Sequence, residues 1–170
     1  MILLSCKSQM SYEAGFKKAE KDDVKFTEES NYEVLSHLRT HLLQSLNDTI
    51  VSDEIIILEN FGTTSFSYSG YIYSNSKITS FNIDKDLKLI FHDILKENFL
   101  NNPYTIESCV IKEFMNGNIK NLAQENDYSI NIEKRLSILS YRKGKYSIEL
   151  IRNPCIINSK REVKYGNSVD

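Results

Sequence analysis

The stretch that decides the fold is EIIILE, residues Glu54–Glu59. Four consecutive aliphatic side chains lie between two carboxylates, and three of the four are isoleucines. β-Branched residues favour extended backbone, and a strand without polar alternation is typical of a position where the sheet is covered on both faces. We therefore predict that Glu54–Glu59 is a central strand.

Two further strands are predicted after short turns. Ser65–Tyr73, SFSYSGYIY, alternates strongly between two sides, and Lys77–Ile83, KITSFNI, places Thr79, Phe81 and Ile83 in phase. The segments between the strands, NFGTTS and SNSK, are rich in turn-forming residues and too short for a crossover helix. The three strands are therefore predicted to pair as an antiparallel meander.

Helical periodicity flanks this meander. Residues 30–48 open with a capping box at Ser30 and Glu33 and carry leucines at helical spacing. Residues 84–100 and 103–115 repeat the helical period, and the chain between them carries the sequence NNP, which predicts a helix end.

Towards the C-terminus, apolar and polar residues again alternate with the two-residue period of β-strands. Residues 127–133 alternate weakly, while residues 135–141 and 145–152 predict a hairpin around a Lys-Gly turn. These elements together predict one α+β domain, with an antiparallel sheet of about five to six strands and two to three helices packed on one face. The domain is expected over residues 30–158, followed by a frayed tail over residues 159–170.

Composition excludes several functional classes. The chain has 170 residues and a formal net charge of −2, and its basic residues are scattered, so no nucleic-acid partner is predicted. It has no P-loop, no dinucleotide-binding fingerprint and no nucleophile elbow, so no cofactor is predicted. No stretch approaches the roughly 18 apolar residues of a transmembrane helix.

The beginning of the chain carries a short motif of another kind. Leu3-Leu4-Ser5-Cys6 places two aliphatic residues and a small residue before a cysteine. This pattern resembles the lipobox of bacterial lipoproteins, which implies that the thiol of Cys6 carries the lipid and that residues 1–6 are the remnant of the signal. The four residues before Ser5 are fewer than a signal peptide needs, so the resemblance implies a translation start further upstream. The alternative is a fortuitous pattern in a cytoplasmic globular protein.

The resemblance also implies a location. Residues 7–29 are polar with few aliphatics, and we expect them to form a flexible tether. Lys7-Ser8-Gln9 lacks the acidic run of surface-displayed lipoproteins, which implies a periplasm-facing lipid anchor in the cell envelope, on the outer membrane in a Gram-negative source. The first predicted partner is therefore the membrane, reached through the acyl chains on Cys6.

The three cysteines fit the same interpretation. If Cys6 takes lipid, Cys109 and Cys155 remain as a pair that could form one disulfide in an oxidising periplasm. Two separate buried thiols are the alternative.

One candidate metal site lies in the helix predicted over residues 30–48. Glu33, His37 and His41 are spaced four residues apart on one face, and two histidines at this spacing can hold one metal ion. Such a site would make the domain a metal-dependent or hydrolytic cell-envelope enzyme. However, the sequence HLRTH lacks the glutamate that zinc proteases place after their first histidine, so we expect a solvated polar face and no metal.

The other candidate is a binding surface at Tyr71 and Tyr73, which share one side of their predicted strand. Tyrosine is favoured at interfaces because an apolar ring is joined to a hydroxyl that can meet water. The alternative is that both residues are ordinary strand formers. We favour a non-catalytic lipoprotein whose domain binds a protein or cell-envelope ligand.

Overall fold

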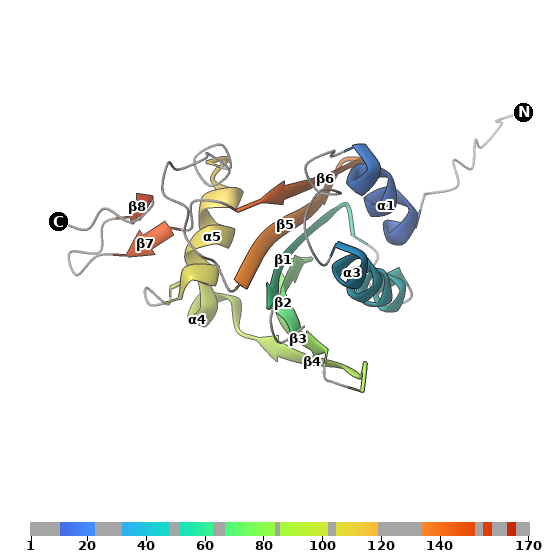
Figure 1. Ribbon diagram of the computed structural model, residues 1–170. Helices are drawn as coiled ribbons and strands as arrows, with labels where there is room; N and C mark the ends of the chain where they lie inside the picture. The colour runs from blue at the N-terminus through green and yellow to red at the C-terminus, as the bar shows by residue number, and fades with distance from the viewer. Residues whose placement is uncertain are drawn as a thin grey trace, which may run out of the picture.

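The computed structural model places a six-stranded sheet between two pairs of helices (Figure 1). The structure describes residues 11–22, 32–47, 52–62, 67–83, 86–101, 105–118, 134–151, 155–157 and 163–165. No helix in this part of the chain is both long and apolar enough to cross a membrane.

All six strands of the main sheet pair antiparallel in the order β4-β3-β2-β1-β5-β6. The strands are β1 (Glu54–Gly62), β2 (Tyr68–Ser74), β3 (Lys77–Ile83), β4 (Leu89–Ile94), β5 (Lys134–Arg142) and β6 (Lys145–Leu150). The predicted α+β class, the meander and the hairpin are confirmed. β1 lies in the middle of the sheet, as the EIIILE stretch predicts.

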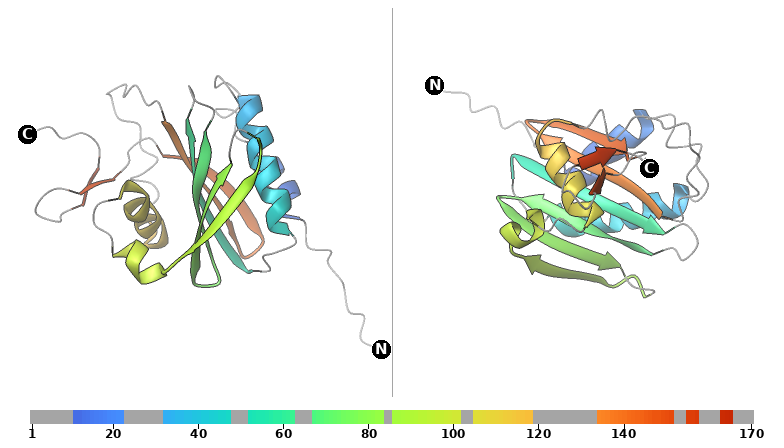
Figure 2. Two further views of the ribbon diagram at one scale, coloured as in Figure 1. Left: turned by 90° about the horizontal axis from the view of Figure 1, so that it is seen from below. Right: turned by 90° about the vertical axis from the view of Figure 1, so that its left-hand side faces the viewer.

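Helices α1 (Tyr12–Asp22) and α3 (Tyr32–Asn47) cover one face of the sheet (Figure 2). The leucines of α3 pack on Ile55 and Ile57 of β1, and Phe16 of α1 is fully buried in the same core. This core also contains aromatic residues from β2, β3 and β5, namely Tyr68, Phe81 and Tyr141.

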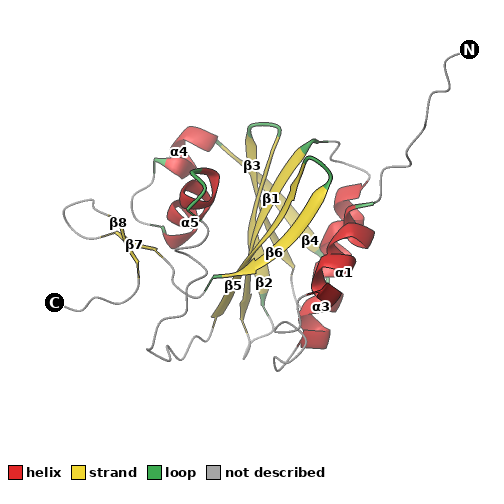
Figure 3. Cartoon of the chain, turned by 90° about the horizontal axis from the view of Figure 1, so that it is seen from above, coloured by secondary structure: helices red, strands yellow, loops and turns green. Residues whose placement is uncertain are grey.

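Helices α4 (Lys96–Leu100) and α5 (Ile106–Met115) cover the other face (Figure 3). Their residues pack on Ile56 and Leu58, the β1 side chains that point away from α3. The prediction that the helices pack on one face is therefore wrong. A strand with aliphatic residues at consecutive positions exposes apolar surface on both faces, and each face needs a cover.

The helix predicted over residues 84–100 is also wrong. Its central residues form β4, and only the short α4 is helical. β4 is an edge strand in which Phe91 is 40% exposed, so it lacks the strict alternation of a half-buried strand. Leu87, Ile90 and Ile94 happen to fall at helical spacing, and pairing with β3 overrides this local pattern.

Two predictions for the ends of the chain need correction where the structure describes them. Helix α1 lies within the segment 7–29 that was predicted to be a flexible tether, because Tyr12, Phe16 and Ala19 form a short apolar stripe on the core. Strand β8 (Val163–Tyr165) lies within the predicted frayed tail and pairs with β7 (Cys155–Ile157). The weak strand predicted over residues 127–133 lies outside the described residues.

Candidate binding site

A hollow opens on the face of the sheet that carries α5, and we call it the Tyr71 hollow. It has a volume of about 130 Å³, and its walls come from three neighbouring strands and the first turn of α5. Its lining residues are Leu58 and Asn60 of β1, Ser69, Gly70 and Tyr71 of β2, Ser80 and Phe81 of β3, and Glu107 of α5.

The strand register explains why the sheet is hollowed at this point. Tyr71 pairs with Leu58 on one side and with Ser80 on the other, while Ser69 pairs with Asn60. Residues directly opposite one another on paired strands point to the same face, so these five side chains lie together on the α5 side. The two serine side chains are too short to fill the space beside the Tyr71 ring.

Gly70 lets the strands approach closely beneath the hollow. A Cβ atom at Gly70 would collide with the carbonyl oxygen of Leu58 and with the ring of Phe81. The Phe81 ring is itself held by Tyr68, with ring centroids 5.3 Å apart. A side chain at position 70 would therefore push apart the strands that form the floor of the hollow.

Tyr71 is fixed by an aromatic neighbour and keeps its proton. Its ring centroid lies 4.6 Å from that of Phe99 in α4, in a tilted arrangement. Burial raises the pKa of Tyr71 above its ordinary value, and the negative charge of Glu107 raises the pKa further. The phenol therefore stays neutral at physiological pH and can donate a hydrogen bond into the hollow.

The size and lining of the hollow limit its chemistry. Pockets for cofactors and drug-sized ligands usually measure about 300–1,000 Å³, whereas this hollow has about 130 Å³. It has room for one side chain or a small group of atoms. The lining residues include two serines but no histidine or lysine that could activate a serine hydroxyl as a nucleophile. The arrangement is suited to recognition.

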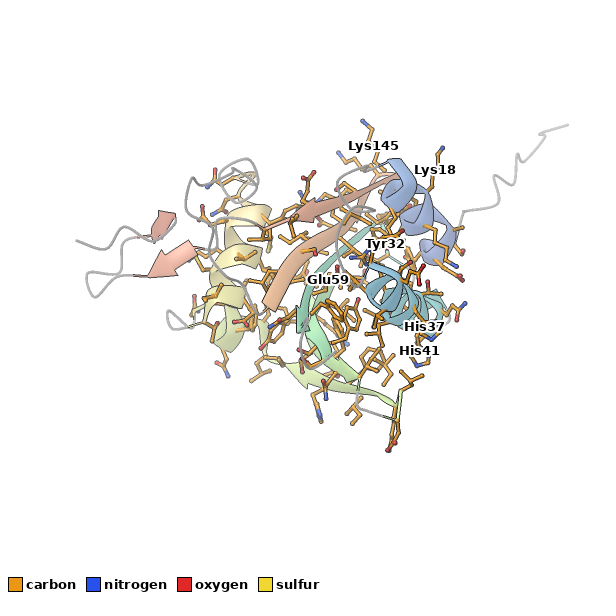
Figure 4. The ribbon with its side chains drawn as sticks, in the orientation of Figure 1. Lys18, Tyr32, His37, His41, Glu59 and Lys145 are labelled. Atoms are coloured by element: carbon orange, nitrogen blue, oxygen red, sulfur yellow. The ribbon has the colours of Figure 1, made fainter. Side chains whose placement is uncertain are left out.

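A second polar cluster lies on the opposite face, between the sheet and α3 (Figure 4). Arg39 of α3 forms ion pairs with Glu59 of β1 and with Glu20 of α1. The hydroxyl of Tyr68 donates a hydrogen bond to Oε2 of Glu59 over 2.8 Å. The three charged side chains are at most 4% exposed, so a ligand has no access to them, and we assign them a structural role.

Burial and charge fix the protonation states in this cluster. Burial alone would lower the pKa of Arg39, but the carboxylates of Glu59 and Glu20 outweigh it and hold the pKa above its ordinary value. Burial raises the pKa of the Tyr68 phenol, and the charge of Glu59 raises it further. Arg39 is therefore charged and Tyr68 neutral at any ordinary pH.

The predicted metal candidates are not assembled into a ligand set. Among the described residues, which include Glu33, His37 and His41, no group of three or more metal-ligating side chains could hold an ion. The Nε2 atom of His41 instead lies 3.0 Å from the carbonyl oxygen of Leu87. Figure 4 shows His37 and His41 on the outer side of α3, away from Glu59.

The two tyrosines of the predicted binding surface have different environments. Tyr71 lines the hollow. Tyr73 is only 7% exposed, and its hydroxyl accepts a hydrogen bond from Nζ of Lys96 over 3.3 Å, so it presents little surface to a ligand.

The cysteines are described only in part. Cys109 of α5 is disulfide-bonded and 5% exposed. Cys6 and the side chain of Cys155 lie outside the described residues.

Sequence reasoning missed the residues that complete these two sites. Glu59 directly follows the aliphatic run of β1, and Arg39 lies within the leucine stripe of α3. The position of Arg39 is unusual for a charged residue and indicates a buried partner. Glu107 carried no such signal, because only the packing of α5 on the sheet brings it to Tyr71.

The sequence matches no protein-family model, and searches of curated proteins and of solved structures find no similar protein.

Proposed function

We propose that this chain is a membrane-tethered lipoprotein whose domain binds a protein or cell-envelope ligand without catalysis. The observation that carries the binding role is the Tyr71 hollow. It combines a fixed aromatic ring, short hydroxyl side chains, an amide and one carboxylate in a space too small for a cofactor. Such a mixture of one aromatic anchor and a few polar groups is typical of recognition sites.

The position of α1 fits an anchor at Cys6. An extended chain spans at most about 3.6 Å per residue, so Tyr12 would lie within about 22 Å of the lipid-bearing residue. α1 packs on the face of the sheet opposite to α5 (Figure 3). A membrane on the α1 side would therefore leave the Tyr71 hollow facing away from the lipid and accessible to a partner.

The disulfide at Cys109 supports an exported location, because disulfides persist mainly in oxidising compartments. We propose Cys155 as its partner. Cys155 begins β7, and β7 packs against α5, the helix that contains Cys109.

Site-specific photocrosslinking tests the binding role. Asn82 is exposed and pairs with Ser69 at the rim of the hollow, so a benzoyl-phenylalanine placed there should crosslink to a partner in the host. The adduct should disappear in the Tyr71→Ala variant. The same photoreactive residue at Lys18, on α1, is the control (Figure 4). A crosslink at position 82 that survives Tyr71→Ala would contradict the assigned site.

The anchor is tested separately. Expression of the full upstream reading frame in a bacterium fed with an alkyne-labelled fatty acid should label the protein, and Cys6→Ser should abolish the label. An unlabelled protein in the cytosolic fraction would contradict the lipoprotein assignment and would favour the cytoplasmic alternative.

A further inference from the structure

The Tyr71 hollow has a negative lining. Glu107 is the one charged residue among the described residues that line it, and its carboxylate is half-buried in the first turn of α5. No ion pair of Glu107 occurs within the described part of the chain. A carboxylate without a countercharge at the wall of a small cavity strongly favours a positively charged occupant.

The other polar groups of the hollow are suited to the same occupant. The space is lined by four residues whose side chains each carry an oxygen that can accept a hydrogen bond, namely Asn60, Ser69, Ser80 and Tyr71. Ser80 already uses its proton, because its hydroxyl donates to the carbonyl oxygen of His92 over 3.4 Å. Its lone pairs remain as acceptors. An ammonium group has three donors and a guanidinium group has five, and neither has an acceptor.

The lining of the hollow disfavours an anion and a divalent cation. An anion would be repelled by Glu107. A tightly held divalent cation needs six or more oxygen ligands, usually with several carboxylates. The hollow offers one carboxylate, that of Glu107. About 130 Å³ accepts the end of one long side chain, while the surrounding sheet surface would contact the rest of the partner.

We propose, as a refinement that rests on the proposed binding role, that the Tyr71 hollow takes a lysine or arginine side chain of a partner protein. Glu107 pairs with the cationic head, the oxygens of β1–β3 accept its remaining protons, and the ring of Tyr71 packs against the aliphatic stem. The charged side chain is the specificity-determining element of the partner, because leaving Glu107 desolvated and unpaired under a neutral partner is unfavourable.

Selection from a random peptide library tests this proposal on the full chain. The library is panned on the wild-type protein and depleted on the Ser69→Leu variant, in which the added side chain fills the hollow without removing the Tyr71 ring. Enriched peptides should share a lysine or arginine at one position. Replacing that residue by norleucine should weaken binding at least tenfold.

The matched variants are Glu107→Gln, which removes the charge, and Glu33→Gln, an exposed glutamate on α3 that should leave binding unchanged. Glu107→Gln should weaken the cationic peptide at least tenfold and should barely affect its norleucine version. If Glu107→Gln weakens the cationic peptide and its norleucine version by the same factor, the proposal is overturned. Competition by millimolar Ca²⁺ would overturn it too.

Different results would contradict the binding site and the positive charge of its occupant. Peptides that need an open hollow but carry no shared cation would overturn the charge assignment and leave the binding role standing. Loss of all wild-type binders when the library is depleted on the filled variant would overturn the binding site itself. Thermal unfolding of each variant shows whether it is folded in the assay.

Discussion

Arg39 of α3 and Glu59 of β1 form a two-point ion pair inside the protein. Nε of Arg39 donates to Oε2 of Glu59 over 3.0 Å, and Nη2 donates to Oε1. Neither side chain is more than 1% exposed, and the same guanidinium also pairs with Glu20 of α1. One cation therefore joins α1, α3 and β1.

Replacing Arg39 by methionine should strongly destabilise the protein. The variant leaves two buried carboxylates without their countercharge, and breaking a buried pair in this way costs about 3–5 kcal/mol. Urea unfolding at neutral pH measures this loss. Lys17→Met is the control, because Lys17 pairs with Glu13 on the exposed surface of α1, where such a pair contributes only about 0.2–0.5 kcal/mol. Equal losses in the two variants would contradict the central role of Arg39.

Tyr68 should make the protein sensitive to alkali. Because burial, with the charge of Glu59, raises the pKa of Tyr68 in the folded state well above 10, the unfolded chain loses this proton first as the pH rises. The stabilisation is complete below about pH 10 and is lost above it, by up to about 1.4 kcal/mol per pH unit for this group.

The Tyr68→Phe variant separates this effect from other alkaline titrations. It should be less stable at pH 8, since a hydrogen bond to a charged group is worth about 1.5–3 kcal/mol. Its deficit should then shrink as the pH passes about 10. Urea unfolding of both proteins between pH 8 and 11 measures the difference, and a deficit that does not change with pH would contradict the raised pKa.

Gly15 should be required for the docking of α1, although alanine is the better helix former. A Cβ atom at Gly15 would fall on the ring of Tyr146. That ring is held by Phe16 at 5.0 Å and by Tyr141 at 4.7 Å between centroids, so it has little room to move. Overpacking costs about 1–3 kcal/mol and should exceed the gain of about 1 kcal/mol in helix propensity.

The Tyr146→Leu variant tests whether the Tyr146 ring causes the loss of stability in Gly15→Ala. In Tyr146→Leu the ring is gone, and Gly15→Ala should become neutral or stabilising in thermal unfolding. A loss of the same size in both backgrounds would show that the Tyr146 ring is not what limits position 15. The comparison also measures how much the packing of α1 on Tyr146 contributes to the stability of the domain.

The central strands could be predicted because their residues contain the local signal. The aliphatic run of β1 and the alternation of β2 and β3 identify strands whatever their neighbours, and Lys143 and Gly144 have the positive φ angles that a tight hairpin turn requires. The segment that became β4 has no such signal. An edge strand exposes residues such as Phe91, and its pairing partner decides its structure.

Helix α1 and the Tyr71 hollow could not be predicted fully, because both depend on contacts between distant segments. Phe16 is followed by two lysines, so the sequence of α1 is typical of a solvated tether. Its burial depends on contacts with distant residues, namely Tyr146 against Phe16 and Arg39 against Glu20. Tyr71 could be named from its strand, but Glu107 could not, because the two meet only through the packing of α5. A pattern in one segment predicts that segment, whereas a site assembled from several segments depends on their tertiary arrangement.

The disulfide gives a final prediction. If Cys109 pairs with Cys155, the bond closes a loop of about 46 residues, and chain-entropy arguments assign it about 4 kcal/mol. Cys109→Ala and Cys155→Ala should each lower the free energy of unfolding by this order, and the double variant should lose no more than either single one.

Alkylation of the unreduced, denatured Cys155→Ala variant identifies the partner directly. It should reveal a newly reactive thiol at Cys109, which is absent from wild type, while Cys6→Ser should leave Cys109 protected. If Cys109 instead becomes reactive in Cys6→Ser and stays protected in Cys155→Ala, its partner is Cys6. That result would also remove the thiol needed for lipid attachment, because one sulfur cannot carry both bonds.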